Sequence, residues 1–177
     1  MGALNDMTQE DGVSQEMREL KKTYLTQSSG TLNLADLAGF SDDEINACYA
    51  MACQKIAVGD LDEAMKLFLL LCLLAHDRSK HWRGLGLTFH RRKIYESANI
   101  MYNLALKRDP NDIIARAFNA ECLLWMNKRV QARHEAELAI ALGTASSKRE
   151  DVAYLRRAEA VMASITSDDK GVGEFVR

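Results

Sequence analysis

The sequence predicts an all-α fold made of three consecutive, similar pairs of antiparallel helices. Residues that disfavour helices are scarce, because the 177 residues contain one Pro and few strand-like runs of Val, Ile and Thr. Small residues also recur at an interval of 34 positions. With 47% hydrophobic and 27% charged residues, the composition is that of a folded domain and not of a disordered chain.

The repeat becomes visible when the segments that begin at Ile45, Ser79 and Ile113 are aligned. Small residues let two helices approach closely, while larger apolar ones fill the gaps between them. The places that coincide are the eighth (Ala52, Gly86, Ala120), the twentieth (Ala64, Ala98, Ala132), the twenty-fourth (Phe68, Tyr102, Ala136) and the twenty-seventh (Leu71, Ala105, Ala139).

The second segment carries nearly the whole tetratricopeptide pattern, W-x-x-L-G-x-x-Y, then A-x-x-x-F-x-x-A, then P. Its matching residues are Trp82, Leu85, Gly86, Phe89 and Pro110. We therefore expect three tetratricopeptide repeats in a right-handed superhelical stack, over 45–78, 79–112 and 113–146. A plain helical bundle whose alanines fall in register by accident is the alternative.

Signals for helix ends agree with these boundaries. Ser41-Asp-Asp-Glu44 is a capping-box sequence that begins the repeat domain, expected over 41–166. Gly59-Asp60 and Asn127-Lys128 fall at the turns inside the first and third repeats. Pro110 ends the second repeat, because Pro disfavours helical angles in the residue before it.

The flanks of the repeats receive their own predictions. Residues 1–40 are expected to form a tail and two short helices, over 15–26 and 31–40, and residues 167–177 a flexible tail. A helix within 147–166 is expected to cap the stack through its apolar positions, Val152, Leu155, Ala158, Val161, Met162 and Ile165. The longest apolar run, Leu67–Ala75, is half the length that crosses a bilayer, which predicts a buried helix and no membrane insertion.

Charge and cysteine usage exclude several classes of function. Lys and Arg number 23 against 25 Asp and Glu, a net charge of −2, and the basic run over 78–93 lacks the interleaved aromatics of a nucleic-acid binder. The four cysteines form no C-x-x-C pair and no secretory leader precedes them, which predicts reduced thiols in the cytoplasm.

No catalytic or metal-binding motif stands out. His76, His81 and His90 lack the spacing of a metal site and are expected at the solvated rim, whereas Cys122 is expected in the core. No nucleophile motif or phosphate-binding loop is present, so the sequence predicts neither an enzyme nor a cofactor.

The first helix of each repeat is expected to line a concave groove with the side chains of places 2, 5, 9, 12 and 13. An apolar strip beside a basic patch would suit an extended peptide. These residues are Asn46, Tyr49, Cys53, Ile56 and Ala57, then Lys80, Arg83, Leu87, His90 and Arg91, then Ile114, Ala117, Glu121, Leu124 and Trp125.

Four stretches together resemble one family, the class II chaperones of bacterial type III secretion. They are Ser29-Gly-Thr-Leu32, Leu71-Cys-Leu-Leu-Ala-His76, Trp82-Arg-Gly-Leu-Gly-Leu87 and Ala120-Glu-Cys-Leu-Leu124, which resemble the family's G-G-T-L/I, L-C-x-L-D-H, L-G-L-G and A-E-C-L. The similarity covers roughly residues 28–145 and is more specific than a generic repeat.

The resemblance implies a bacterial cytoplasmic chaperone that masks hydrophobic translocator proteins before export. In the family an extended N-terminal client segment lies in the groove, whose first-repeat aromatic positions fall on Tyr49, Cys53 and Ile56. It further implies a possible homodimer through residues 15–60 and a possible transcription activator as partner. The alternatives are a regulatory cofactor of such an activator and a generic tetratricopeptide scaffold, which would bind acidic tails through a Lys and an Asn where Tyr49 and Cys53 stand.

Overall fold

The computed structural model describes residues 34–146 and 148–173, with side chains as far as residue 167. The chain divides into two units, one up to Phe40 and one from Ser41 onward. In the first unit the structure describes the short helix α2 (Leu34–Leu37) within the helix expected over 31–40. The helix expected over 15–26 lies outside the described residues. All regular secondary structure in the described part is helical, which confirms the predicted fold class.

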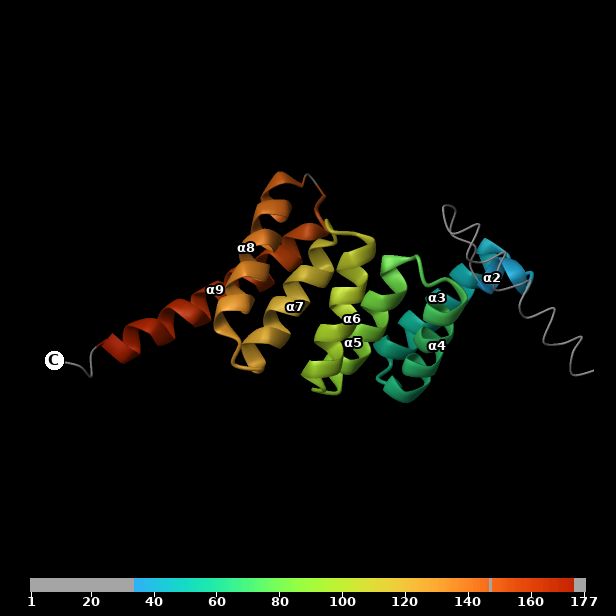
Figure 1. Ribbon diagram of the computed structural model, residues 1–177, viewed down its shortest axis with the longest axis horizontal. Coiled ribbons are helices and arrows are strands. Elements are labelled where there is room, and N and C mark those ends of the chain that lie inside the picture. The colour runs from blue at the N-terminus through green and yellow to red at the C-terminus, as the bar shows by residue number, and fades with distance from the viewer. Residues whose placement is uncertain (1–33, 147, 174–177) are drawn as a thin grey trace, which may run out of the picture. The chain divides into compact units, whose positions relative to one another are not determined.

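The second unit consists of three antiparallel helix pairs and a final helix, which follow one another in chain order (Figure 1). Helices α5 and α7 begin at the first residues of the second and third predicted repeats. The pairs are α3 (Asp42–Ala57) with α4 (Leu61–Leu74), α5 (Ser79–Arg91) with α6 (Tyr95–Arg108), and α7 (Ile113–Trp125) with α8 (Arg129–Ala145); the final helix is α9 (Asp151–Gly173).

The local signals at helix ends act as the sequence predicts. Ser41 and Glu44 form a complete capping box at the start of α3, in which each side chain bonds the other residue's backbone N–H. The turns inside the three pairs each contain one residue with positive φ, namely Gly59 (83°), Lys93 (61°) and Asn127 (58°). These positions are 34 residues apart, so the backbone repeats with the same period as the core.

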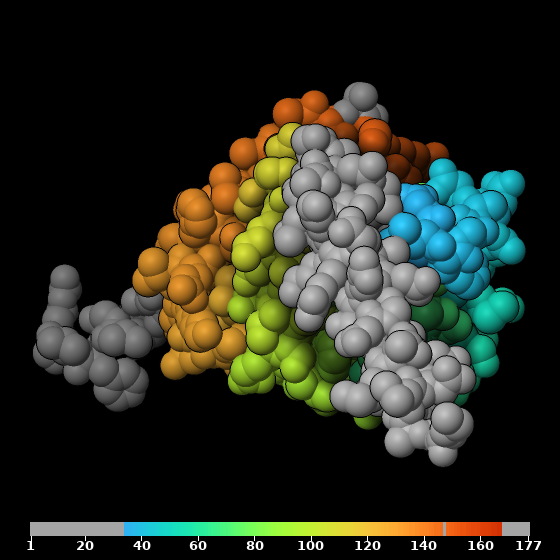
Figure 2. Space-filling view, turned by 45° about the vertical axis from the view of Figure 1, so that its right-hand side comes forward, coloured from blue at the N-terminus to red at the C-terminus, as the bar shows by residue number. Residues whose placement is uncertain are grey.

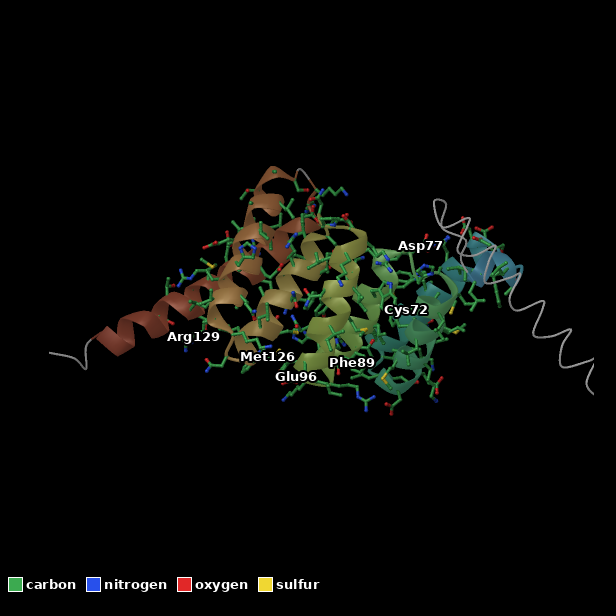
Figure 3. The ribbon with its side chains drawn as sticks, viewed as in Figure 1. Cys72, Asp77, Phe89, Glu96, Met126 and Arg129 are labelled. Carbon is green, nitrogen blue, oxygen red and sulfur yellow. The ribbon has the colours of Figure 1, made fainter. Side chains whose placement is uncertain are left out.

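Figure 3 shows the turns of the second and third pairs at the same end of the stack. Phe89 and Glu96 flank the α5–α6 turn, and Met126 and Arg129 flank the α7–α8 turn. Each pair therefore repeats the direction of the pair before it, so that all first helices can share one face.

The core consists of the twelve residues at the coinciding places of the repeat, and all twelve are buried. Their small members create room for the rings of neighbouring helices. A Cβ added at Gly86 would lie 2.8 Å from Tyr102, and one at Gly84 would lie 2.1 Å from Phe68. Both distances are too short for real contacts, so these helices approach closely only because glycine has no side chain there.

The third pair lacks an aromatic ring at the place of Phe68 and Tyr102, because Ala136 stands there. Helix α9 compensates by packing Ala158, Val161 and Ile165 onto the small residues of α7 and α8. It therefore covers the end of the stack, as expected of a cap. Helix α9 continues to Gly173, past residue 166, where the capping helix was expected to end.

Two expectations about burial also need correction. His81 is fully buried and not at the rim, because its Nδ1 lies 3.0 Å from the carbonyl oxygen of Ala75 at the end of α4. Within the apolar run, Phe68, Leu71, Cys72, Leu74 and Ala75 are buried, but Leu69, Leu70 and Leu73 are exposed on α4. One face of this helix thus packs against the stack while the other presents leucines.

None of the described helices is both long and apolar enough to cross a lipid bilayer.

The positive φ at Lys93 provides a test of the turn geometry. A left-handed conformation destabilises a residue with a Cβ by about 1–2 kcal/mol, whereas glycine adopts it without this strain. Lys93→Gly is therefore expected to raise the free energy of unfolding by about 1 kcal/mol, measured by urea denaturation followed by circular dichroism. Lys66→Gly, at an exposed interior position of α4, is the control and is expected to lower it by about 1 kcal/mol. A loss of stability in Lys93→Gly would contradict the turn geometry.

Candidate binding groove

The first helices of the three pairs enclose a pocket of about 190 Å³ together with α9. It combines one face of each of these helices, so it exists only when all three pairs are stacked. The lining residues are Tyr49, Cys53, Ile56, Phe68, Arg83, Gly84, Leu87, Ile114, Phe118 and Tyr154. Except at Arg83 and Cys53 the lining is aromatic, aliphatic or glycine, which suits an apolar side chain.

Tyr49 forms one wall of this pocket and is held by aromatic contacts. Its ring centroid lies 5.9 Å from that of Phe68, edge to face, and 5.8 Å from that of His81. Burial disfavours the charged form of each group. It therefore raises the pKa of the Tyr49 hydroxyl and lowers the pKa of the His81 imidazole. Both groups are therefore neutral near pH 7, as an apolar pocket requires.

Among the described residues that line the pocket, Arg83 is the one cation. Its guanidinium donates to the Asp112 carboxylate at 2.7 Å, and Ser79 donates to the same oxygen at 2.9 Å. Burial alone would lower the pKa of Arg83, but Asp112 outweighs it and the pKa is raised. Asp112 also caps α7 by accepting from the backbone N–H of Ala115 at 3.0 Å. This pair joins the start of α7 to the middle of α5.

The other basic residues predicted for the groove bind neighbouring helices. Lys80 donates to Asn46 at 2.8 Å and lies 4.9 Å above the ring centroid of Tyr49, while Arg91 donates to the carbonyl oxygen of Ile56 at 3.1 Å. All of these contacts join the second pair to the first. The predicted basic patch therefore stabilises the packing between pairs.

Helix α9 also lines this pocket, which was not predicted. Tyr154 of α9 lies 6.2 Å from Phe118 between ring centroids, and the guanidinium of Arg157 lies 4.2 Å above the Phe118 ring. Arg157 also pairs with Glu121 of α7. Burial raises the pKa of Glu121, but the nearby His90 imidazole and the charge of Arg157 outweigh burial, so the pKa is lowered.

A second hollow of about 460 Å³ lies between α7 and α9. Its lining residues are Glu121, Leu124, Trp125, Ala153, Arg156, Arg157, Ala160 and Val161. The predicted groove residues thus separate into groups. Tyr49, Cys53, Ile56, Arg83, Leu87 and Ile114 line the first pocket; Glu121, Leu124 and Trp125 line the second; and Asn46, Ala57, Lys80, His90, Arg91 and Ala117 line neither.

One groove assignment is corrected outright. Ala117 is fully buried among the small residues that join α7 to α8 and α9, so it presents no surface to a peptide. Phe118, one position later, takes that place. The signal that could have found it is its spacing of four residues from Ile114, which puts both on one face of α7.

His90 lies between a thiol and a carboxylate in an arrangement that resembles a catalytic triad. Its Nδ1 is 3.4 Å from the Sγ of Cys122, and its Nε2 is 3.7 Å from Glu121. Cys122 is fully buried, however, and burial raises the pKa of its thiol to about 12. The thiol is therefore protonated and inaccessible, which excludes a nucleophile. His90 instead contacts the rings of Phe118 and Tyr95, at 5.4 and 5.6 Å.

A hollow with a mainly polar lining lies on the opposite face of the stack. Figure 2 shows α6, in yellow-green, and α8, in orange, side by side on this face. The hollow of about 420 Å³ between them contains three asparagines, and Asn119 accepts a bond from Asn99 at 2.6 Å and donates one to Asn103 at 3.4 Å. Asn119, at a place that is apolar in other repeats, is thereby paired. Within the described residues no group of His, Cys, Asp and Glu side chains could hold a metal ion.

Comparisons with known proteins agree with this geometry, although no protein-family model matches the chain. The Salmonella typhimurium chaperone protein SicA is 30% identical over 132 residues, which are 75% of this chain and 79% of SicA. The Yersinia pestis low calcium response locus protein H is 27% identical over 159 residues, 90% of this chain and 92% of that protein.

Solved structures give the same result. A type III secretion complex from Aeromonas hydrophila matches with a TM-score of 0.76 and 26% identity, over 86% of this chain and 98% of that one. PcrH in complex with the chaperone-binding region of PopD matches at 0.68 and 28%, over 74% and 97%. The Yersinia enterocolitica translocator chaperone SycD, in an alternative dimer, matches at 0.68 and 26%, over 73% and 96%.

The link between Glu121 and α9 predicts a pH-dependent stability. A carboxylate whose pKa is lower in the folded state stabilises the fold above its unfolded pKa, here 4.5, and this stabilisation disappears as the pH falls through the folded value. Glu121→Gln is expected to lower the free energy of unfolding at pH 7 by about 1 kcal/mol. The difference from the wild type should shrink below pH 4.5 in urea denaturation. An equal difference at pH 7 and pH 3.5 would contradict this role.

Proposed function

The chain belongs to the class II chaperones of type III secretion translocators, and we propose that it binds an extended segment of a hydrophobic translocator in the groove between α3, α5, α7 and α9. The observation that supports this most directly is the apolar pocket shared by all three helix pairs. PcrH, a relative of this chain with the same fold, is found in complex with the chaperone-binding region of PopD. The resemblance noted in the sequence is confirmed by these relatives.

The proposed mechanism is reversible masking. A translocator has apolar segments that associate with one another in water, and a chaperone that occupies part of the chain prevents this before export. One apolar anchor buried in the pocket would contribute about 1.5–3 kcal/mol, and ordering the client segment opposes part of that gain. Several anchors along the groove are therefore needed for micromolar or tighter binding.

The family acts by binding, so the chain is a chaperone and not an enzyme. We place its action in the bacterial cytoplasm, where translocators are held before export. A transcription activator as a further partner remains a prediction from the resemblance alone.

Co-expression with a type III secretion translocator from the same organism tests the proposal. The expected result is a soluble translocator that co-purifies with the chaperone. A translocator that stays insoluble and unbound would overturn the proposed function.

Leu87→Asp is expected to weaken client binding at least about tenfold, because it places a charge in the pocket without altering the helix. Cys53→Arg is a second variant, at an exposed position of the same pocket, that blocks it with bulk and charge. Affinity is measured by calorimetry with the purified client segment, and folding by circular dichroism. The control is Val130→Asp, which introduces the same charge at an 84% exposed valine of α8, outside the groove. Unchanged affinity in both groove variants would remove this pocket from the binding site.

We also propose a homodimer, since SycD is found in dimers. The predicted interface, residues 15–60, lies partly outside the described residues. The exposed leucines Leu69, Leu70 and Leu73 of α4 extend the candidate surface beyond residue 60, and Leu73 is 66% exposed. Three neighbouring leucines in water form an apolar patch that favours association.

Leu73→Glu is therefore expected to shift the chain from dimer to monomer, because a dimer would have to bury the new charge. The measurement is light scattering coupled to gel filtration at several concentrations. Val130→Glu, at an exposed residue of α8, is the matched control and should leave the oligomeric state unchanged. A wild-type chain that is monomeric throughout would contradict the dimer without affecting the groove.

A further inference from the structure

The two hollows of the candidate groove are continuous along two helices. On α7, Ile114 and Phe118 line the first pocket, and Glu121 and Trp125 line the second. Steps of three or four residues keep these four side chains on one face of the helix. On α9, Tyr154 lines the first pocket, and Arg157 and Val161 the second. A ligand that leaves the first pocket along α7 therefore meets the second.

The second hollow has an aromatic anchor in place before any ligand binds. Trp125 is 64% exposed, and its ring stacks on Tyr95 with centroids 5.9 Å apart and planes 9° apart. The stacking restricts the indole while leaving most of it in water. Exposed and restricted tryptophans contribute strongly to interfaces, because they bury a large area at little entropic cost.

The charges around this hollow favour an acidic ligand. Arg157 is already paired with Glu121 and stacked on Phe118. Arg156, one residue earlier, is exposed and has no ion pair with any residue in the described part of the chain. The hollow thus combines an apolar floor of Leu124 and Val161 with one cation available to a ligand.

We propose that the second hollow, lined by Trp125 and Arg156, is a second anchor site for the same client. It would receive an apolar side chain of the client, and an Asp or Glu next to that side chain would pair with Arg156. This proposal rests on the proposed function. Phe118 and Trp125 are seven residues apart on α7, about 10 Å along the helix, which an extended client spans with about three residues. One extended segment can therefore occupy both hollows, and the two anchors reinforce each other.

The first experiment uses tryptophan fluorescence of the full chain, free and in complex with a co-expressed translocator from the same organism. The chain has two tryptophans, so the difference between wild type and Trp125→Phe isolates the Trp125 signal. In the free chain Trp125 should be quenched by acrylamide and emit at long wavelength. In the complex the quenching should fall several-fold and the emission shift to shorter wavelength. Unchanged quenching in the complex would overturn the proposal.

The same experiment excludes other occupants. If Trp125 is already shielded in the free chain at every concentration, another segment of this chain covers the hollow. If its shielding rises with concentration, a second copy does. Either result overturns the client proposal.

The second experiment compares dissociation rates of the complex. Trp125→Ala and Arg156→Glu are each expected to speed dissociation about tenfold, the Arg156 effect falling at high salt. Arg149→Glu, an exposed arginine ahead of α9 and outside both hollows, is the matched control for charge. If Leu87→Asp abolishes the complex while both Trp125→Ala and Arg156→Glu leave it unchanged, the second site is wrong and the groove stands. If the wild type forms no complex, both proposals fail.

Discussion

The structure depends on how closely the helices approach one another at residues with little or no side chain. Gly84 and Gly86 leave room for the rings of Phe68 and Tyr102, and alanines at the same interval serve the other contacts. Because close packing is lost when even one methylene is added, this constraint allows little variation. The stacking that it produces sets the first helices side by side, and the groove is a consequence of that stacking. The site is therefore a property of the packed repeats rather than of any single helix.

The fold could be predicted from the sequence because this constraint is periodic. The 34-residue interval of small residues, the Ser41 capping box and the Gly59 and Asn127 turns are local signals, and each has its expected structure. The turn at Lys93 was less visible, since lysine rarely adopts positive φ and the conformation there is imposed by the repeat. The end of α9 was placed too early, because the apolar positions that indicate the cap stop at Ile165 while the helix continues to Gly173.

The site was predicted less completely, because the direction of a side chain does not reveal its partner. Lys80, Arg83 and Arg91 lie on the expected helix but bond to neighbouring helices, and such contacts join residues about 30 positions apart. Tyr154 enters the pocket because α9 lies beside α7, which no repeat pattern specifies. Here tertiary packing decides which of the candidate residues remain available to a ligand.

Because Tyr154 of α9 lines the same pocket as Tyr49 of α3, binding in this pocket has a consequence for the stability of the stack. In a stack of repeats each repeat contacts only its neighbours. A chaperone without a client can therefore unfold locally at either end while its other repeats stay folded. A client segment that contacts Tyr49 and Tyr154 at once would bridge the first pair and α9, which in the described part of the chain contact each other through the second and third pairs. Loaded molecules would then melt as a single unit, whereas empty ones fray and present cleavable ends to proteases. A bound client segment would thus stabilise the chaperone that binds it.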